Sequence, residues 1–480
     1  MSQSRRLDDL PHRFADRTEI AEVRAAHGEL APGDASGVRY RLAGRVMGRR
    51  LMGKAAFLDL EDRSGRLQLL ASADGIGGEL FAAVNDTQLG DVVGVEGEAI
   101  SSRRGELTLQ LGGFELLAPC EHPLPDLHHG LADVEARYRQ RYVDLMVNAD
   151  VREDTQRRAR MISAGRAYLD GAGFVEVETP VLQPLYGGAS ARPFTTHHNE
   201  LDRSFYLRIA TELYLKRLIV GGLERVYELG KDFRNEGVSF KHNPEFTMVE
   251  WYEAYADYTD GMRRTEEFTA ASVRGALGTT VITRDGREID MAPPWPRKRL
   301  ADAIREACGV DVMEYRYAAD PVSGLRAALV ERGAAAAAGD ATWPQLVDRA
   351  LSHFVEPNVV EPVFLVDYPA ELSPLARPFA DDPSLVERFE AFCCGMEFAN
   401  GYSELNDPEL QLRRFEEQAA MQAAGDEDAQ PLDADYVEAL RYGMPPTAGL
   451  GLGIDRLAML VCNRPSIRDV ILFPALRERG

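Results

Sequence analysis

Long apolar runs are missing from this 480-residue chain, which excludes a simple membrane-spanning architecture. No uninterrupted hydrophobic stretch approaches the roughly 20 residues that a membrane-crossing helix needs. The opening segment MSQSRRLDDLPHRFADR also lacks the apolar core of a secretion signal. We therefore expect a cytoplasmic protein with no membrane partner.

Cysteine is scarce, and no pair of cysteines has the C-x-x-C spacing of a zinc ribbon or a redox motif. The five cysteines are Cys120, Cys308, Cys393, Cys394 and Cys462. An odd, scattered set argues against a disulfide framework, so we expect reduced thiols in a reducing compartment.

Net positive charge is also lacking, because the chain carries a formal charge of -22. This balance argues against nucleic acid as a partner, although phosphate contact needs only a local basic patch. Arginines cluster at positions 45, 49 and 50, at 103 and 104, and at 137, 139 and 141. Composition alone favours an ordinary solvated surface for these clusters.

The length and the 45% hydrophobic content predict two or three domains. We expect a polar segment at 1–38 with weak helical character around 20–27, an all-β OB-fold barrel at 39–118, a Pro/His-rich linker at 119–135, and a catalytic domain at 136–480 with a more helical insertion at about 260–360. The barrel is predicted from five short alternating strands separated by glycines. Those strands are expected at 40–46, 56–59, 67–71, 91–95 and 107–111.

The common nucleotide-binding fingerprints are absent. No G-x-x-x-x-G-K-[ST] occurs, which excludes a P-loop. The glycine-studded segment 448–456 has the wrong spacing for a dinucleotide fingerprint and no acidic residue about twenty positions later. Its pattern instead predicts a strand and then a helix that carries Arg456, a combination suited to close approach of the backbone to a nucleotide.

Two segments, 225–236 and 245–252, predict an antiparallel hairpin with a long tip. Phe246, Met248, Glu250 and Tyr252 alternate along the second strand and share one face. A buried glutamate on that face needs a partner, and a ligand cation would supply one. The alternative is a partly solvated sheet face without function.

A third acidic segment, 389–404, contains candidates for Mg²⁺ ligands, Glu390 and Glu397. Asn400, Tyr402 and Glu404 share one strand parity and Glu397 has the other, so a bulge or a strand start must intervene if all four line one pocket. An ordinary surface salt bridge is the alternative for each of these carboxylates. The same holds for Glu212, which lies four residues before Lys216 in a helical pattern.

In combination these segments resemble the class II aminoacyl-tRNA synthetases. Glu-Thr-Pro at 178–180 resembles motif 1 of that class, 233–236 with 242–246 resembles motif 2, and 449–456 resembles motif 3. The three occur in the right order, and no H-x-G-H or KMSKS-like segment of class I is present. The resemblance implies an α+β catalytic domain on an antiparallel sheet flanked by helices, preceded by the OB-fold barrel.

Within class II the chain is most similar to the lysyl-tRNA synthetase family of bacterial type. The phrases that carry this likeness are 187–193, 211–217, 399–406 and 466–474. The sequence departs from the family pattern at Lys241, where arginine is common, and at Tyr186, where proline is common. Its N-terminal region is also short, so the basic helix before the barrel is reduced.

The resemblance implies a role for each candidate residue. The implied ATP site comprises Arg234 on the α-phosphate, Arg456 on the γ-phosphate, Phe246 stacked on adenine, Glu236 and His242. Glu390 and Glu397 would hold magnesium. The implied lysine site comprises Gly188, Glu212, Glu250, Tyr252, Asn400 and Glu404. The implied anticodon readers are Arg49, Arg50, Phe57, Gln68 and Glu106.

The implied reaction attaches L-lysine to tRNA(Lys) through a lysyl-adenylate, with release of pyrophosphate and AMP, in a homodimer. Such phosphoryl chemistry needs positioning and charge neutralisation rather than a protein nucleophile. Three alternatives stay open: an aspartate or asparagine enzyme, a relative that modifies proteins with lysine-like groups, and an inactive RNA-binding relative. The acidic pocket argues against the first alternative, and the barrel argues against the second. The joint presence of Arg234, Arg456 and the acid pair Glu390 and Glu397 argues against the third.

Overall fold

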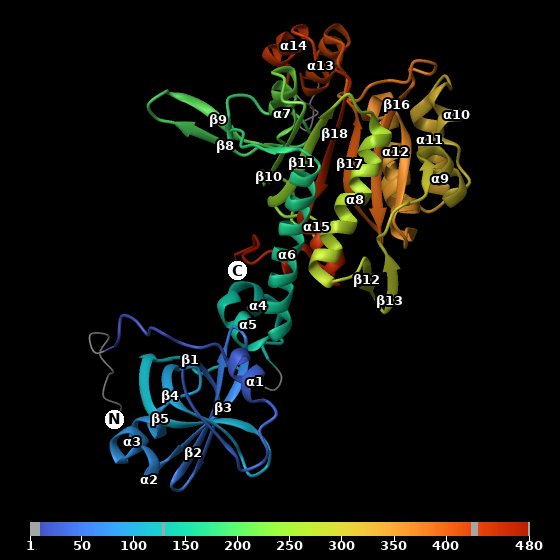
Figure 1. Ribbon diagram of the computed structural model, residues 1–480. Coiled ribbons are helices and arrows are strands. Elements are labelled where there is room, and N and C mark those ends of the chain that lie inside the picture. Colours follow the sequence, from blue (N-terminus) through green and yellow to red (C-terminus); the bar gives the residue numbers. More distant parts are fainter. Residues whose placement is uncertain (1–9, 127–129, 424–430, 479–480) are drawn as a thin grey trace. The chain divides into compact units, whose positions relative to one another are not determined.

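Figure 1 shows a computed structural model that describes residues 10–126, 130–423 and 431–478. The chain forms two compact units, Met1–Asn148 and Ala149–Gly480. Parts of the expected N-terminal segment (1–9) and of the expected linker (127–129) lie outside the described residues.

The first unit is built on a closed five-stranded barrel with strand order β1-β2-β3-β5-β4. Its strands are β1 (Ala35–Met52), β2 (Ala55–Asp62), β3 (Gly65–Ser72), β4 (Val92–Ser101) and β5 (Leu107–Ala118). Alternate residues such as Leu58, Leu60 and Leu69 fill the barrel core, because neighbouring side chains of a strand point to opposite faces. Each strand overlaps one of the five predicted from the sequence, so the expected barrel is confirmed.

The described residues of the first unit also form five short helices. They are α1 (Ile20–His27), α2 (Ala73–Ile76), α3 (Gly78–Asp86), α4 (Val134–Arg139) and α5 (Arg141–Val147). The first has the bounds predicted for the weak helical pattern, and its buried Ile20 and Val23 join the barrel core.

The second unit contains an eight-stranded sheet in the order β14-β15-β16-β17-β18-β11-β10-β6. Its central strands pair antiparallel, and only the outer pairs β14–β15 and β10–β6 are parallel. The strands are β6 (Val175–Glu176), β10 (Arg225–Phe233), β11 (Glu245–Ala254), β14 (Arg297–Arg299), β15 (Val363–Pro369), β16 (Leu385–Cys393), β17 (Met396–Ser403) and β18 (Thr447–Gly453). The predicted hairpin is formed by β10 and β11.

Helices flank this sheet, and smaller sheets attach to it (Figure 1). The long helices α6 (Ala149–Gly171) and α8 (Tyr258–Leu277) pack against each other, and α8 also contacts β17 and β18. The other helices near the sheet are α7 (Glu212–Val220), α13 (Pro408–Ala423), α14 (Ala434–Arg441), α15 (Ile454–Val461) and α16 (Ile467–Val470). The smaller sheets join β7 (Leu182–Gln183), β9 (Arg203–Leu207) and β8 (Thr195–His198), and β12 (Val281–Arg284) with β13 (Arg287–Asp290).

The region expected to be more helical, about 260–360, forms a second apolar core against β15. Its helices after α8 are α9 (Leu300–Cys308), α10 (Val312–Arg316), α11 (Pro321–Glu331) and α12 (Trp343–Ala350). The alanine run ends in a short 3₁₀ turn, Ala335–Gly339, which agrees with the predicted helix end or loop.

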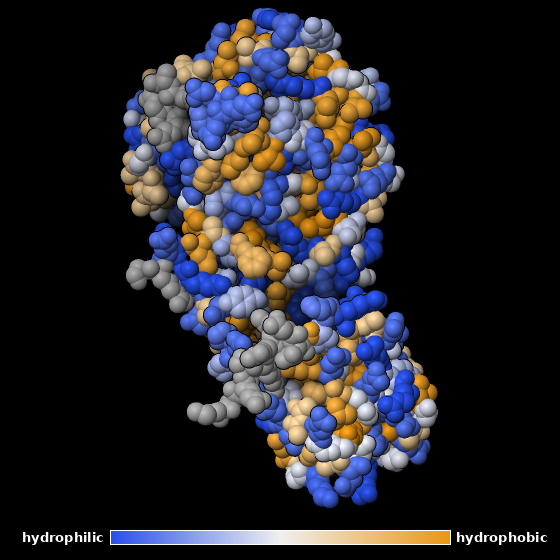
Figure 2. Space-filling view, turned by 90° about the vertical axis from the view of Figure 1, so that its left-hand side faces the viewer, coloured by the Kyte–Doolittle hydropathy of each residue, from blue (hydrophilic) through white to orange (hydrophobic). Residues whose placement is uncertain are grey.

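Hydrophobic and hydrophilic residues are interspersed over the face seen in Figure 2. Among the residues that the structure describes, no helix is both long enough and apolar enough to pass through a membrane.

The packing of the second unit can be tested at Trp251, which is 1% exposed and lies against Phe268 with ring centroids 5.1 Å apart. We expect Trp251→Ala to lower the free energy of unfolding by about 3–5 kcal/mol, because the removed ring leaves a cavity. The three tryptophans, 251, 295 and 343, all belong to the second unit, so the fluorescence of the remaining two reports its unfolding in denaturant. Trp251→Phe is the control and should cost less, whereas an unchanged midpoint in Trp251→Ala would contradict the packing.

Candidate active site

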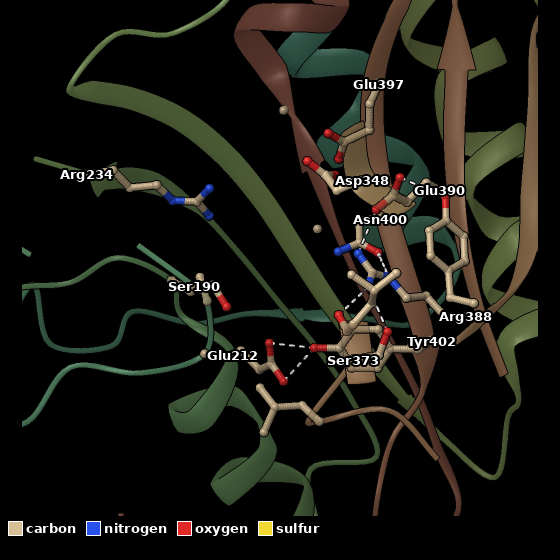
Figure 3. Close-up of a pocket in the computed structure, with 18 of the residues that line it drawn as sticks. Ser190, Glu212, Arg234, Asp348, Ser373, Arg388, Glu390, Glu397, Asn400 and Tyr402 are labelled. Carbon is tan, nitrogen blue, oxygen red and sulfur yellow. Dashed lines mark hydrogen bonds and ion pairs between the residues drawn. The ribbon is translucent and has the colours of Figure 1, made fainter. Parts of the chain in front are cut away.

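A cavity of about 980 Å³ opens on the face of the sheet formed by β11, β18, β17 and β16. It contains most of the candidate residues, as the close-up in Figure 3 shows for several of them. The candidates that line it are Gly188, Glu212, Arg234, Glu236, His242, Phe246, Glu250, Tyr252, Glu390, Glu397, Asn400 and Arg456. Glu404 does not line the cavity. It is buried next to Gly449, which does line it.

The hairpin β10–β11 positions a cation above an aromatic ring. Arg234 follows the end of β10, and its backbone N–H donates to the carbonyl of Pro244 at 2.9 Å across the long tip. The guanidinium of Arg234 lies 5.1 Å from the ring centre of Phe246. Within the described residues no carboxylate pairs with Arg234, so its charge faces the cavity (Figure 3). A flat apolar ring beside an uncompensated cation suits a purine and its phosphates.

Arg456 lies in the first turn of α15 and lines the same cavity. Its Nη1 donates to the Glu397 carboxylate at 3.0 Å, and its Nη2 lies 3.3 Å from His242 Nε2. Desolvation and the charges of Arg456 and Lys241 lower the pKa of His242 to about 4. The imidazole is therefore neutral at pH 7 and contributes hydrogen bonding rather than charge.

The two candidate magnesium ligands come from paired strands. Glu390 on β16 pairs with Asn400 on β17, and beyond the following pair a bulge sets Phe392 opposite Glu397. The bulge turns Glu397 to the face of Glu390, which is the irregularity that the sequence required. Glu390 accepts from Tyr368 at 2.8 Å.

Burial raises the pKa of Glu390 to about 7. The charge of Arg388 opposes this rise, and the charge of Glu397 adds to it. The pKa of Asp348, which faces the same cavity, is raised by burial and by Glu397. The negative charges of Glu390, Glu397 and Asp348 repel one another, and a bound cation would offset this repulsion. Across residues 10–126, 130–423 and 431–478, however, no three acidic, histidine or cysteine side chains converge as a preformed metal site.

The other end of the cavity is closed by buried carboxylates and a buried lysine. Lys216 is fully buried, and its ammonium donates to Glu212 at 2.6 Å and to Glu404 at 2.7 Å. Glu212 also accepts from the Tyr402 hydroxyl at 2.8 Å on both oxygens, a contact drawn in Figure 3. The salt bridge between Glu212 and Lys216 that the helical spacing suggested is therefore formed, but inside the pocket wall rather than on the surface.

Two glycines of β18 keep this end open. Gly449 and Gly451 pair with Tyr252 and Glu250 on one side. A Cβ at Gly449 would lie 1.9 Å from Glu404 Oε1 and 2.4 Å from the Tyr252 ring. Any side chain at this position would therefore separate Glu404 from the cavity.

The carboxylate of Glu404 has one oxygen without a partner. Its Oε2 is held by Lys216, whereas its buried Oε1 makes no hydrogen bond to any described residue. Burial raises the pKa of Glu404 to about 8, although Lys216 lowers it. Burial with the nearby Asp232 and Glu212 raises the pKa of Glu250 to about 8. An unpaired buried acceptor among like charges could accept a hydrogen bond from an added ammonium group.

The remaining candidates, Glu236, Gly188 and Asn400, also line the cavity. Glu236 lies exposed at the hairpin tip, and Gly188, at φ +87°, leaves room for Glu212, whose Cβ would be 3.0 Å from an added Cβ. Asn400 accepts from Arg388 at 3.0 Å, so its amide N–H₂ is directed to the cavity (Figure 3).

Sequence reasoning did not select Arg388, Asp348, Tyr402 and Lys216 as site residues. Arg388 is two residues from Glu390 on the same strand, so an argument from strand alternation could have found it. Tyr402 was noted for sharing the strand face of Asn400 and Glu404, but it was not assigned a role. Lys216 was noted only as an ion-pair partner. Asp348 lies on α12 in the insertion and offered no local signal.

In the barrel, four of the five candidate RNA-contacting residues gather on the outer face. Arg50 pairs with Phe57 across β1 and β2, with its guanidinium 6.0 Å from the ring centre. Gln68 donates to Glu106 at 3.0 Å. Arg49 is not part of this group, because it shares the parity of the core residue Leu58 and donates to the Asn85 carbonyl.

Comparison with known proteins gives a family for each part of the chain. Residues 133–477 match the family described as tRNA synthetases class II (D, K and N), and residues 40–117 match the OB-fold nucleic acid binding domain. The lysine–tRNA ligase of Pelotomaculum thermopropionicum is 50% identical over 91% of this chain and 86% of its own length. That of Chloroflexus aurantiacus is 50% identical over 99% and 95%, and that of a Synechococcus species is 49% identical over 98% and 95%.

The matches span the barrel, the three motif segments and the walls of the cavity, at an identity that establishes common descent. The chain belongs to the class II tRNA synthetases of the aspartate, lysine and asparagine group.

Proposed function

We propose that this protein uses ATP to attach L-lysine to tRNA(Lys) through a lysyl-adenylate. The single observation that carries the choice of lysine is the unpaired Oε1 of the buried Glu404, beside Glu250 and Tyr252 at the closed end of the cavity. The names of the relatives that cover nearly all of the chain point the same way.

A charge count supports lysine over the other two amino acids of this group. The closed end holds three carboxyl groups, Glu212, Glu250 and Glu404, against one buried cation, Lys216. Burial and neighbouring carboxylates raise the pKa of Glu250 and of Glu404 to about 8, so this excess of carboxyl groups would be ionised at pH 7 only beside a second cation. An aspartate side chain would add another negative charge to this excess, and an asparagine amide would not relieve it. The ammonium of lysine would.

The α-amino end of the substrate has its own partners. Glu212 and the carbonyl of Gly188 are proposed to receive the α-ammonium group, and the amide of Asn400 and the guanidinium of Arg234 the carboxylate. Glu404, with Glu250 and Tyr252, would receive the ε-ammonium past Gly449. Because the discrimination is made by charge at the pocket end, ornithine would be rejected by only about 1–3 kcal/mol.

For ATP we propose Phe246 as the stacking platform for adenine, with Glu236 and His242 completing the site. Arg234 would neutralise the α-phosphate and Arg456 the γ-phosphate. Glu390 and Glu397 fit Mg²⁺, which is usually held by one or two carboxylates together with substrate phosphates. Bound there, the ion would neutralise phosphate charge.

The chemistry needs only positioning and charge. A carboxylate oxygen of lysine attacks the α-phosphorus and pyrophosphate leaves; a hydroxyl of the terminal ribose of the tRNA then attacks the lysyl carbonyl and AMP leaves. Arg234 would hold the attacking carboxylate and the α-phosphate together, and its freedom from any carboxylate partner among the described residues supports this role. His242, neutral at pH 7, would donate or accept a hydrogen bond at the triphosphate.

We propose that the domain at 39–118 reads the anticodon. Phe57 would stack on a base, with Gln68 and Glu106 at base edges and Arg50 on the backbone, as single-stranded RNA is usually bound. Arg49, directed to α3, would support the barrel and the reading face indirectly. A cytoplasmic location, which we also propose, agrees with the five free thiols.

We also propose a homodimer that joins around the motif 1 segment 178–180. Val175, Val181 and Leu182 flank this segment and are 51%, 41% and 48% exposed. Apolar side chains gathered on the surface in this way favour a protein interface. We expect sedimentation equilibrium to give a dimer mass, and a fully active monomer would contradict this proposal.

The function is tested by pyrophosphate exchange with each of the twenty amino acids, in which lysine alone should support rapid exchange. Arg234→Ala should reduce lysine-dependent exchange by at least about 10²–10³-fold, because a preorganised charge is lost.

Phe57→Ala should leave exchange intact and cost about 1–3 kcal/mol in tRNA charging only, the value of one stacked base. Equal loss of both activities in Phe57→Ala would contradict the division of labour.

The role of Lys216 is tested by the pH dependence of kcat/KM for lysine. Lysine binding requires ionised carboxylates, so kcat/KM should rise as the pH passes through about 8, the pKa of Glu404 and of Glu250. Lys216→Met removes a charge that lowers the pKa of Glu404. The rise should therefore move to higher pH, and between about 8 and the new pKa of Glu404 kcat/KM should fall about tenfold for every pH unit, because only Glu404 takes up a proton there.

Lys298→Met, at an exposed lysine that pairs with Glu306, is the matched control and should leave the profile unchanged. Thermal unfolding of both variants separates a loss of folding from a loss of charge. An unmoved pH profile in folded Lys216→Met would show that Lys216 acts only on structure.

A further inference from the structure

Three sulfur atoms lie together at the tip of the hairpin β16–β17, apart from the cavity. The Sγ atoms of Cys393 and Cys394 are 3.5 Å apart, and Cys393 Sγ is 3.8 Å from the Sδ of Met291. Met291 and Cys393 are buried, and Cys394 is half-buried. Neither the proposed reaction nor any of the three motifs uses these residues.

The backbone explains why two neighbouring thiols point the same way. Successive side chains of a strand point to opposite faces, so Cys393 and Cys394 would diverge if β16 continued. Cys394 instead has φ +52° and begins the turn with Gly395, at φ +71°. Both thiols consequently reach the same acceptor, the carbonyl of Val360, at 3.5 and 3.7 Å.

Met291 is fixed by the chain that follows β13. Its N–H donates to the Thr280 carbonyl at 3.0 Å, and its carbonyl accepts from the Trp295 indole at 3.2 Å. The thioether therefore extends from a backbone that hydrogen bonds hold in place rather than from a loose loop.

The distances from Cys393 to the other two sulfur atoms suit a three-coordinate soft cation. Metal–sulfur bonds are about 2.3 Å long, so three sulfurs in a plane around one ion lie about 4 Å apart. The two separations above, 3.5 and 3.8 Å, are close to that value. Thiolate and thioether ligands select Cu(I) over hard ions such as Mg²⁺.

One of the three sulfur-bearing side chains reaches solvent. The half-buried Cys394 gives the ion a path from solvent, while the buried Cys393 and Met291 shield it.

We propose that Cys393, Cys394 and Met291 form a binding site for a soft monovalent cation of the Cu(I) class. Binding forms two metal–thiolate bonds and one metal–thioether bond and releases the two thiol protons, with no change of oxidation state. The site is independent of the proposed function, because no residue of the cavity contributes to it.

The test is an anaerobic titration of the reduced full-length protein with Cu(I) against bathocuproine disulfonate, whose coloured Cu(I) complex reports the metal that the protein does not hold. We expect one equivalent per chain to be withdrawn. Cys394→Ser should weaken binding more than about 100-fold, since even changes to groups beyond the direct ligands of a metal cost about 10–100-fold. Met291→Leu, which keeps the volume but removes the thioether, should weaken it by at least about tenfold.

Cys120→Ser is the control, because this half-buried thiol belongs to the other unit, and it should bind as the unaltered chain does. Far-UV circular dichroism confirms that each variant is folded. X-ray absorption of the loaded protein should show three sulfur neighbours. Binding that is equal in the unaltered chain and in the Cys393→Ser/Cys394→Ser variant would overturn the site, and so would two sulfur neighbours with unchanged binding in Met291→Leu.

Discussion

The ion pairs of Lys216 with Glu212 and Glu404 hold the closed end of the cavity together. Three carboxylates buried near one another would repel, and burial alone would keep them protonated. One fully buried ammonium offsets part of this cost and fixes Glu404 through one oxygen only. The other oxygen of Glu404 remains an unpaired acceptor. The contacts that stabilise the pocket wall therefore leave room for one more cation at this end of the cavity.

The central strands convert this local chemistry into a site. Antiparallel pairing of β11, β18 and β17 places Tyr252, Gly449 and Tyr402 in one row across the sheet. Because the middle strand has glycine in that row, the outer two side chains border a hollow rather than a packed face. The bulge between β16 and β17 then returns Glu397 to the face of Glu390 at the nucleotide end.

The two ends of the cavity hold different charged groups. At one end Arg234 and Arg456 lie with the acids Glu390, Glu397 and Asp348, which suits the proposed phosphates and their metal ion. At the closed end carboxyl groups outnumber the one lysine, which suits the proposed amine. The barrel, a separate compact unit, carries its polar and aromatic side chains on its outer face while leucines fill its interior. The residues proposed for recognition of RNA and those proposed for activation of the amino acid therefore belong to different units.

Alternation and glycine punctuation are local signals, so the amino-acid pattern alone was enough to predict the barrel, the hairpin β10–β11 and the strand–helix step that carries Arg456. It was also enough to predict the family, since three motifs occur in order. Three features became visible only in the folded chain. Lys216 pairs with carboxylates of the pocket wall, Asp348 from the insertion faces the same cavity as Glu390, and Arg49 turns away from Phe57. These depend on contacts between segments far apart in the chain, or on whether a side chain faces the core, and no local pattern encodes either.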